Sequence, residues 1–215
     1  MRPSLRGPIW QKKKNQQMKN LTTLLLPLAV AGLFACNSGA NRNQGDTTTA
    51  ADTGITQDLA HDVNKDMLEG DSLRGDSKAL TEAAEAGVWE VLVATQAQTK
   101  TTNAGVKKLA KHMQDAHEKA NKELLALATK KNVILPNALP DSKAKDVSQL
   151  FEKSGTDFDK AFLEELADAH ESAIKLFDKT AADANDPEVK EWFGKTLPEL
   201  RKHLDMIKAE QAKLK

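Results

Sequence analysis

One carboxylate and three imidazoles occupy positions where a packed helix would ordinarily carry Leu or Ala. Each falls on the apolar repeat of a different predicted helix. They are Glu90, His117, His170 and His203. Three histidines and one carboxylate form a competent donor set for one transition-metal ion, Zn, Mn, Fe or Cu, because neutral imidazole offers a lone pair. The sequence therefore predicts a candidate metal or redox site at these four residues.

The same residues also admit a purely structural interpretation. A buried His can hydrogen-bond a neighbouring Glu, and such polar pairs can fix the register of a helical bundle without any metal. From the sequence both interpretations stay open.

The spacing of the four residues from the predicted turns places them at matching heights. Glu90 lies about 12 residues before the first turn and His117 about 14 after it, which is ~18 and ~21 Å along the helix axes. His170 lies about 15 residues before the second turn and His203 about 17 after it, or ~22 and ~25 Å. We therefore expect the four side chains to meet near the middle of a bundle. His112 and Asp115 flank this seam, and we expect both to be exposed to solvent.

A di-iron centre needs more carboxylates than these helices supply. It takes a Glu from each of two helices and a Glu-x-x-His from each of the other two. The residues three positions before the three histidines are Gln114, Ala167 and Leu200. We therefore expect no di-iron centre and no ferroxidase activity. The chain also lacks a Gly-rich phosphate loop, a nucleophile elbow and a zinc-protease motif, so no enzyme class is indicated.

Four long amphipathic patterns must position these residues. They cover residues 77–101, 103–131, 157–184 and a final helix capped by Asp186 with Pro187 at its first position. The first is expected to begin at the N-cap pair Asp76-Ser77. At about 25 to 29 residues, each helix is ~37 to 44 Å long. Matched lengths predict an all-α four-helix bundle over residues 76–215.

The connections predict the topology of this bundle. Short turns make the first two and the last two helices antiparallel hairpins. About 25 residues separate the hairpins, with a short helix that Asp141 is expected to cap and Gly155 just beyond its end. That is enough chain for a ferritin-like crossover between helices two and three, and a plain up-down-up-down bundle is the alternative.

The start of the chain has the pattern of a secretory signal peptide over residues 1–35. It holds six basic residues and no acid, and an apolar run over residues 21–35 follows the basic part. A retained membrane helix is the alternative, although the run is shorter than the ~20 residues of a typical span. Met18, directly before Lys19, is a candidate for the true start.

The apolar run ends in Leu33-Phe34-Ala35-Cys36, which resembles the bacterial lipobox, with Phe34 in place of the usual smaller residue. The resemblance implies that Cys36 is lipidated and anchors the mature protein to a bilayer. Residues 36–75 then read as a flexible tether with one short helix, in which Leu59, Val63 and Met67 recur every four residues.

Composition limits the partners. The 215 residues carry 31 basic and 31 acidic side chains, but without the leader the balance is 25 to 31. An acidic mature chain argues against nucleic acid as a partner. With Cys36 as the single cysteine, no internal disulfide can form.

Several segments resemble a bacterial envelope family catalogued as domain of unknown function 4142. They are AAEAGVWEV at 83–91, VKKLAKHMQDAHEKANKELLALA at 106–128, Leu135-Pro136, His170 and LPELRKHL at 197–204. The resemblance covers roughly residues 77–213 and implies a ferritin-like bundle in an exported or membrane-anchored protein. That family usually has an acid directly before the histidine that matches His117, whereas this chain has Ala116, with Asp115 one step earlier.

Two function classes follow. We favour an exported, lipid-anchored binding or structural protein of the bacterial cell envelope, on the outer membrane or the periplasmic face. Its partners would be the membrane, through the anchor, and an envelope protein. The alternative is a metal-binding or redox protein that uses the mid-bundle Glu and His residues.

Overall fold

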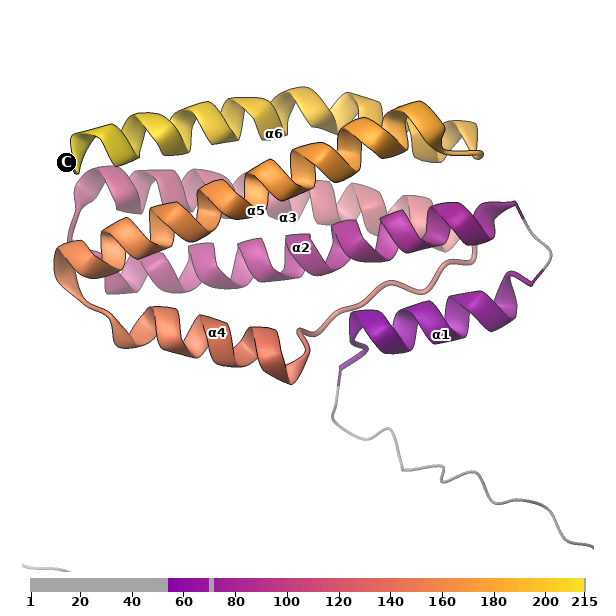
Figure 1. Cartoon of the computed structure of the whole chain (residues 1–215), viewed down its shortest axis with the longest axis horizontal. Helices are drawn as coiled ribbons and strands as arrows, with labels where there is room; N and C mark the ends of the chain where they lie inside the picture. The colour runs from indigo at the N-terminus through magenta and orange to yellow at the C-terminus, as the bar shows by residue number, and fades with distance from the viewer. Residues whose placement is uncertain (1–53, 70–71, 215) are drawn as a thin grey trace, which may run out of the picture. The chain divides into compact units, whose positions relative to one another are not determined.

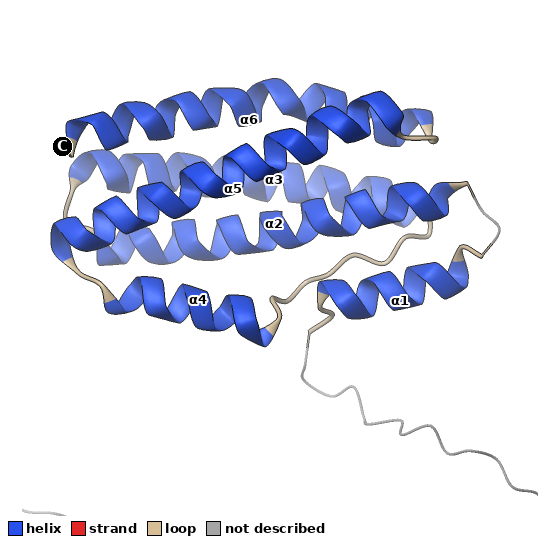
Figure 2. Cartoon of the chain, in the orientation of Figure 1, coloured by secondary structure: helices blue, strands red, loops and turns tan. Residues whose placement is uncertain are grey.

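The computed structural model describes residues 54–69 and 72–214, and every regular element in that part of the chain is a helix. The helices are α1 (Gln57–Met67), α2 (Leu73–Lys100), α3 (Ala104–Lys130), α4 (Asp141–Glu152), α5 (Gly155–Asp183) and α6 (Pro187–Lys213), as Figures 1 and 2 show. The predicted all-α class is confirmed. None of the described helices is both long and apolar enough to cross a bilayer. The predicted signal peptide and Cys36 lie outside the described residues.

The two predicted hairpins are present, and each is set by a capped turn. Asn103 precedes α3, and its side-chain oxygen accepts hydrogen bonds from the backbone N–H groups of Gly105 and Val106 at 2.8 and 3.2 Å. Asp186 caps α6 in the same way, ahead of Pro187 at the first helical position. Because each turn is only a few residues long, α3 folds back on α2 and α6 folds back on α5.

The hairpins are joined by a connection that runs the length of the bundle and carries α4 (Figure 1). Lys131, just after α3, lies beside Asp186 at the start of α6, whereas Lys100 at the opposite end donates to the carbonyl of Phe151 in α4. Consequently α3 and α5 run in the same direction, which is the ferritin-like crossover. The up-down-up-down alternative is wrong.

The roles of Asp141 and Gly155 differ in part from those predicted. Asp141 is the first residue of α4, and Pro140 occupies the N-cap position. Gly155 lies just beyond the end of α4, as predicted, and it is also the first residue of α5, with a φ of 56° that favours glycine.

The predicted cap of the first long helix is also wrong. α2 begins at Leu73, and Asp76, inside its first turn, is buried. Its carboxylate accepts hydrogen bonds from the backbone N–H groups of Asn185 at 3.1 Å and Asp186 at 2.7 Å, in the α5–α6 turn. Asp76 therefore uses its acceptor capacity to join two hairpins.

A second buried carboxylate joins the hairpins at the other end of α2. Thr101 follows α2 and donates its hydroxyl to Asp159 near the start of α5, at 2.5 Å. Both side chains are buried. We call Asp76 and Asp159 the carboxylate clamps, because together they tie both ends of α2 to the second hairpin.

The core consists of two apolar clusters. One is built around Phe158, Phe162 and Met113, and the other around Phe177, Phe193 and Leu80. Along each long helix, the predicted Glu or His lies between the stretches that feed the two clusters. A polar layer therefore divides the apolar core near the middle of the bundle.

α1 lies within the segment where the sequence predicts a short helix, but it packs through a different face. Ala60 and Asn64 are buried, whereas Leu59 and Met67 are about half exposed, at 51% and 56%. The Asn64 amide donates to the Ile134 carbonyl at 2.8 Å and accepts from the Ile134 N–H at 2.7 Å. These two bonds fasten α1 to the long connection.

Candidate metal site

The structure brings the four predicted site residues together in one buried layer. Glu90 comes from α2, His117 from α3, His170 from α5 and His203 from α6, and all are at most 9% exposed. The ring centroids of the three histidines are 5.4 to 5.5 Å apart in every pairing. One nitrogen of each ring lies within 4.8 Å of the corresponding nitrogens of the other two.

Glu90 holds the ring of His170 rather than joining the group of three nitrogens. Its Oε1 lies 3.1 Å from Nδ1 of His170, and the same Nδ1 lies 2.9 Å from the carbonyl oxygen of Leu166. Two oxygen acceptors at Nδ1 keep a proton there, so Nε2 is the nitrogen of His170 that faces the other imidazoles. A carboxylate or carbonyl behind the imidazole is the usual way in which proteins fix the tautomer of a metal-binding histidine.

Two of the ring nitrogens lie within hydrogen-bond distance of each other, and their spacing also suits a small cation. Nε2 of His170 lies 3.4 Å from Nδ1 of His203. Two nitrogens that each bind a tetrahedral ion at 2.0–2.1 Å are about 3.3–3.4 Å apart. The distance between these two nitrogens therefore matches one edge of a tetrahedral site without any movement of the helices.

Three atoms of this layer are buried and have no hydrogen-bond partner among the described residues. They are Nε2 of His117, Nε2 of His203 and Oε2 of Glu90. Buried polar atoms are nearly always paired, so an unpaired donor or acceptor indicates a missing ligand, ion or water. The residues present therefore fit a metal ion that would take up these atoms.

The charges in the layer are set by burial and by the Glu90–His170 pair. Burial raises the pKa of the Glu90 carboxyl, but the three nearby imidazoles and the hydrogen bond with His170 outweigh it, so its pKa is lowered overall. Burial lowers the pKa of His170, yet Glu90 and the Leu166 carbonyl outweigh it and raise that pKa above its usual value. Glu90 is therefore ionised, and His170 keeps its proton to a higher pH than an ordinary histidine.

The other two imidazoles are neutral. Burial lowers the pKa of His117 and, with smaller effects of His170 and His112, outweighs the opposing effect of Glu90. Burial and the neighbouring His117 and His170 lower the pKa of His203 to about 3. The layer thus offers two neutral imidazoles and one negative carboxylate, and His170 would release its second proton when an ion binds at Nε2, because metal ligands must be deprotonated.

Two further residues adjoin the layer and were not predicted. His112 was expected to be exposed, but it is only partly exposed, and its ring lies 5.3 Å from that of His203. Glu199, one turn before His203 on α6, places Oε1 3.3 Å from Nε2 of His203. The i, i+4 spacing of Glu199 and His203 is the sequence signal that could have revealed Glu199. Asp115, in contrast, is exposed as predicted and pairs with Lys111.

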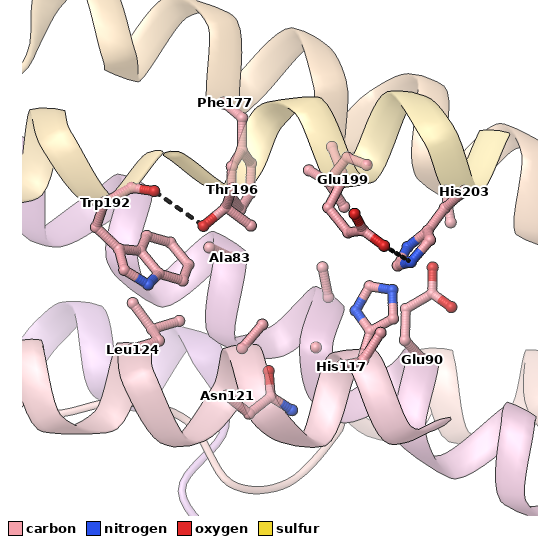
Figure 3. Close-up of a pocket in the computed structure, with 17 residues that line it drawn as sticks. Ala83, Glu90, His117, Asn121, Leu124, Phe177, Trp192, Thr196, Glu199 and His203 are labelled. Carbon is pink, nitrogen blue, oxygen red and sulfur yellow. Dashed lines mark hydrogen bonds and ion pairs between the residues drawn. The ribbon is translucent and has the colours of Figure 1, made fainter. Parts of the chain in front are cut away.

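A cavity of about 70 Å³ adjoins the layer on one side. Figure 3 shows Glu90, His117 and His203 at one end of it and Trp192 at the other. Small residues make up a large part of its wall, namely Ala83, Ala86, Gly87, Ala116, Ala120, Ala169 and Ala173. Space of this size holds a few water molecules or one small ligand next to the imidazoles.

Comparison with known proteins identified a family and a similar fold. Residues 64–209 match a family described as "Domain of unknown function (DUF4142)". A crystal structure of a DUF305 fragment from Deinococcus radiodurans is similar, with a TM-score of 0.57 and 12% identity, over 64% of this chain and 95% of that chain. At this identity the likeness concerns the fold alone. No curated protein matched the chain.

Proposed function

The chain belongs to the family described as domain of unknown function (DUF4142), a description that assigns no activity, and we propose from its site that it binds one transition-metal ion in mid-bundle. His117, His170 and His203 would supply the nitrogen ligands. Glu90 would orient His170, and its carboxylate would balance part of the charge of the ion. Zn, Mn, Fe and Cu all accept imidazole ligands.

One observation carries this proposal: three imidazoles from three helices converge, while Nε2 of His117 and Oε2 of Glu90 stay unpaired and buried. A layer that served only to fix helix register would gain stability by pairing these atoms, because each unpaired buried atom costs about 1–3 kcal/mol. A bound ion would take Nε2 of His117 as a ligand, and its charge would compensate the buried Oε2 of Glu90. The adjoining cavity leaves room for a water or a small ligand on the ion.

Metal analysis of the full chain, purified in detergent without chelators, tests the proposal. We expect close to one ion in the mid-bundle site of each chain, and loss of that ion in His117→Ala and His203→Ala. His61→Ala, in α1 and outside the layer, is the matched control and should keep the metal. Thermal unfolding of each variant shows whether it has folded. Folded His117→Ala and His203→Ala proteins with the wild-type metal content would defeat the proposal and leave a structural polar layer.

We further propose that the protein is exported and anchored in the bacterial cell envelope, on the outer membrane or the periplasmic face. The leader pattern of residues 1–35 and the lipobox-like sequence before Cys36 support this location. Two or more acyl chains on Cys36 would hold the protein stably at a bilayer without a spanning helix. The bundle would then be available to a partner protein of the envelope.

Mass spectrometry of the protein from a bacterial host tests the anchor. We expect an N-terminal acylated Cys36 and recovery in the membrane fraction, and Cys36→Ser should move the protein to the soluble fraction. An unmodified Cys36 in membrane-free protein would refute the anchor and leave the metal proposal unaffected.

A further inference from the structure

We propose a second, solvent-facing metal position that His112, Glu199 and His203 form next to the mid-bundle site. One ligand atom from each of the three lies within 4.8 Å of the other two. The inference rests on the proposed function in one respect, because His203 belongs to both groups.

The two nitrogens of His203 face different groups. Nδ1 lies 3.4 Å from Nε2 of His170, on the side of the mid-bundle site. Nε2 lies 3.3 Å from Oε1 of Glu199, on the opposite edge of the ring. One imidazole can therefore contribute a nitrogen to each of two ions, if it loses its ring proton when both bind.

The second group has unused ligand atoms of its own. Nε2 of His203 and Nε2 of His112 are buried, and neither has a hydrogen-bond partner in the described part of the chain. His203 is 2% exposed, and its Nε2 lies deep in the protein, 3.3 Å from Oε1 of Glu199 but without a hydrogen bond among the described residues. Two imidazoles and a carboxylate suit the same borderline transition metals as the first group.

The second position differs from the first in its access to solvent. The Glu199 side chain is 47% exposed, and Figure 3 shows it on the wall of the cavity above His203. Lys202 also reaches Glu199, with Nζ 3.1 Å from Oε1 and 3.5 Å from Oε2. Since an incoming cation must compete with this ammonium group, the second position should bind more weakly than the first. An exposed, weaker position beside a buried one is suited to taking up an ion from solution.

Equilibrium dialysis of the full chain in detergent against Co²⁺ and against Zn²⁺, with elemental analysis, tests the second position. We expect two ions per chain at saturation, one tight and one weak. His112→Ala and Glu199→Gln should each lower the affinity for the second ion by at least ~10–100-fold, which is the usual effect of losing a residue that only supports a ligand. Both should keep the first ion. Lys202→Gln should raise the affinity for the second ion. Glu171→Gln is the control, because it alters an exposed ion pair with Lys208.

The outcomes separate this inference from the proposed function. A single ion that survives Glu199→Gln and His112→Ala but is lost in His170→Ala would overturn the second position and uphold the first. A single ion that survives His170→Ala but is lost in Glu199→Gln would overturn the first and uphold the second. No binding in the wild type would overturn both. Because Glu199 is exposed, Glu199→Gln gives a folded protein even if His112→Ala does not.

Discussion

Replacement of Glu90 by glutamine separates the charge of the mid-bundle layer from its shape. Glu90→Gln preserves the size of the side chain and one oxygen that can accept a hydrogen bond from Nδ1 of His170. In the wild-type structure this nitrogen lies 3.1 Å from Oε1 of Glu90. Nδ1 also keeps the Leu166 carbonyl at 2.9 Å, so the His170 tautomer stays the same. The substitution therefore removes one negative charge from the buried site that we propose binds a cation.

We expect the dissociation constant of the bound ion to rise 10–100-fold in Glu90→Gln, the usual effect of removing a supporting carboxylate. This range equals about 1.4–2.8 kcal/mol of binding free energy, at 1.4 kcal/mol per factor of ten. The free energy of unfolding of the metal-free protein should change by about 1 kcal/mol or less, because His170 can release its proton when its charged partner is absent.

Competition titration with a chromophoric chelator measures the affinity, and urea unfolding of the metal-free protein measures stability. Glu85→Gln is the matched control, since Glu85 is also a buried carboxylate of α2 but pairs with Lys143 away from the layer. Its metal affinity should equal that of the wild type. Equal affinities for Glu90→Gln and the wild type would refute the role that we give to the Glu90 charge.

Two further predictions concern the ends of the bundle. Asp76→Ala leaves the buried N–H groups of Asn185 and Asp186 without their acceptor, so the free energy of unfolding should fall by about 1–3 kcal/mol per group; urea unfolding measures it, and exposed Asp115→Ala should change it by less than about 0.5 kcal/mol. Partial burial raises the pKa of Asp186, but hydrogen bonds from Lys131 and two backbone N–H groups outweigh it and lower that pKa overall. A carboxyl whose pKa is lowered by folding stabilises the folded protein at any pH above its unfolded pKa of ~3.9. This stabilisation is lost as the pH falls through the folded-state pKa. The stability difference between wild type and Asp186→Asn should therefore shrink below pH ~4. A difference that stays constant from pH 6 to pH 2.5 would contradict this assignment.

Helix periodicity predicted most of the fold because each long helix buries one continuous stripe. The same periodicity, with the turn positions, predicted that Glu90, His117, His170 and His203 would share one level. The crossover followed from the length of the connection between the hairpins, which is sufficient to span the bundle. These features depend on local spacing, which a sequence displays directly.

The errors arose where one residue type serves two purposes. Asp76 has the identity of a helix cap, but its carboxylate is used in a tertiary contact that no local pattern encodes. Gly155 was assigned only to the stop after the short helix, whereas it also opens α5 with a positive φ, two residues before the predicted start at Asp157. His112 was judged from a helical wheel, which treats a helix alone and does not include the approach of His203 from α6.

The carboxylate clamps restrict how this family of bundles can change in length. An extra residue in α2 between Asp76 and Glu90 would turn the Glu90 side chain by about 100° and shift it by about 1.5 Å. A helix that was free at one end could slide or rotate to restore the layer, but α2 is held at Asp76 and again through Thr101 at Asp159. Insertions and deletions should therefore accumulate in the connection around α4 and before α1. The stretch from Asp76 to Thr101, which the two clamps hold at its ends, should keep a constant number of residues across related chains.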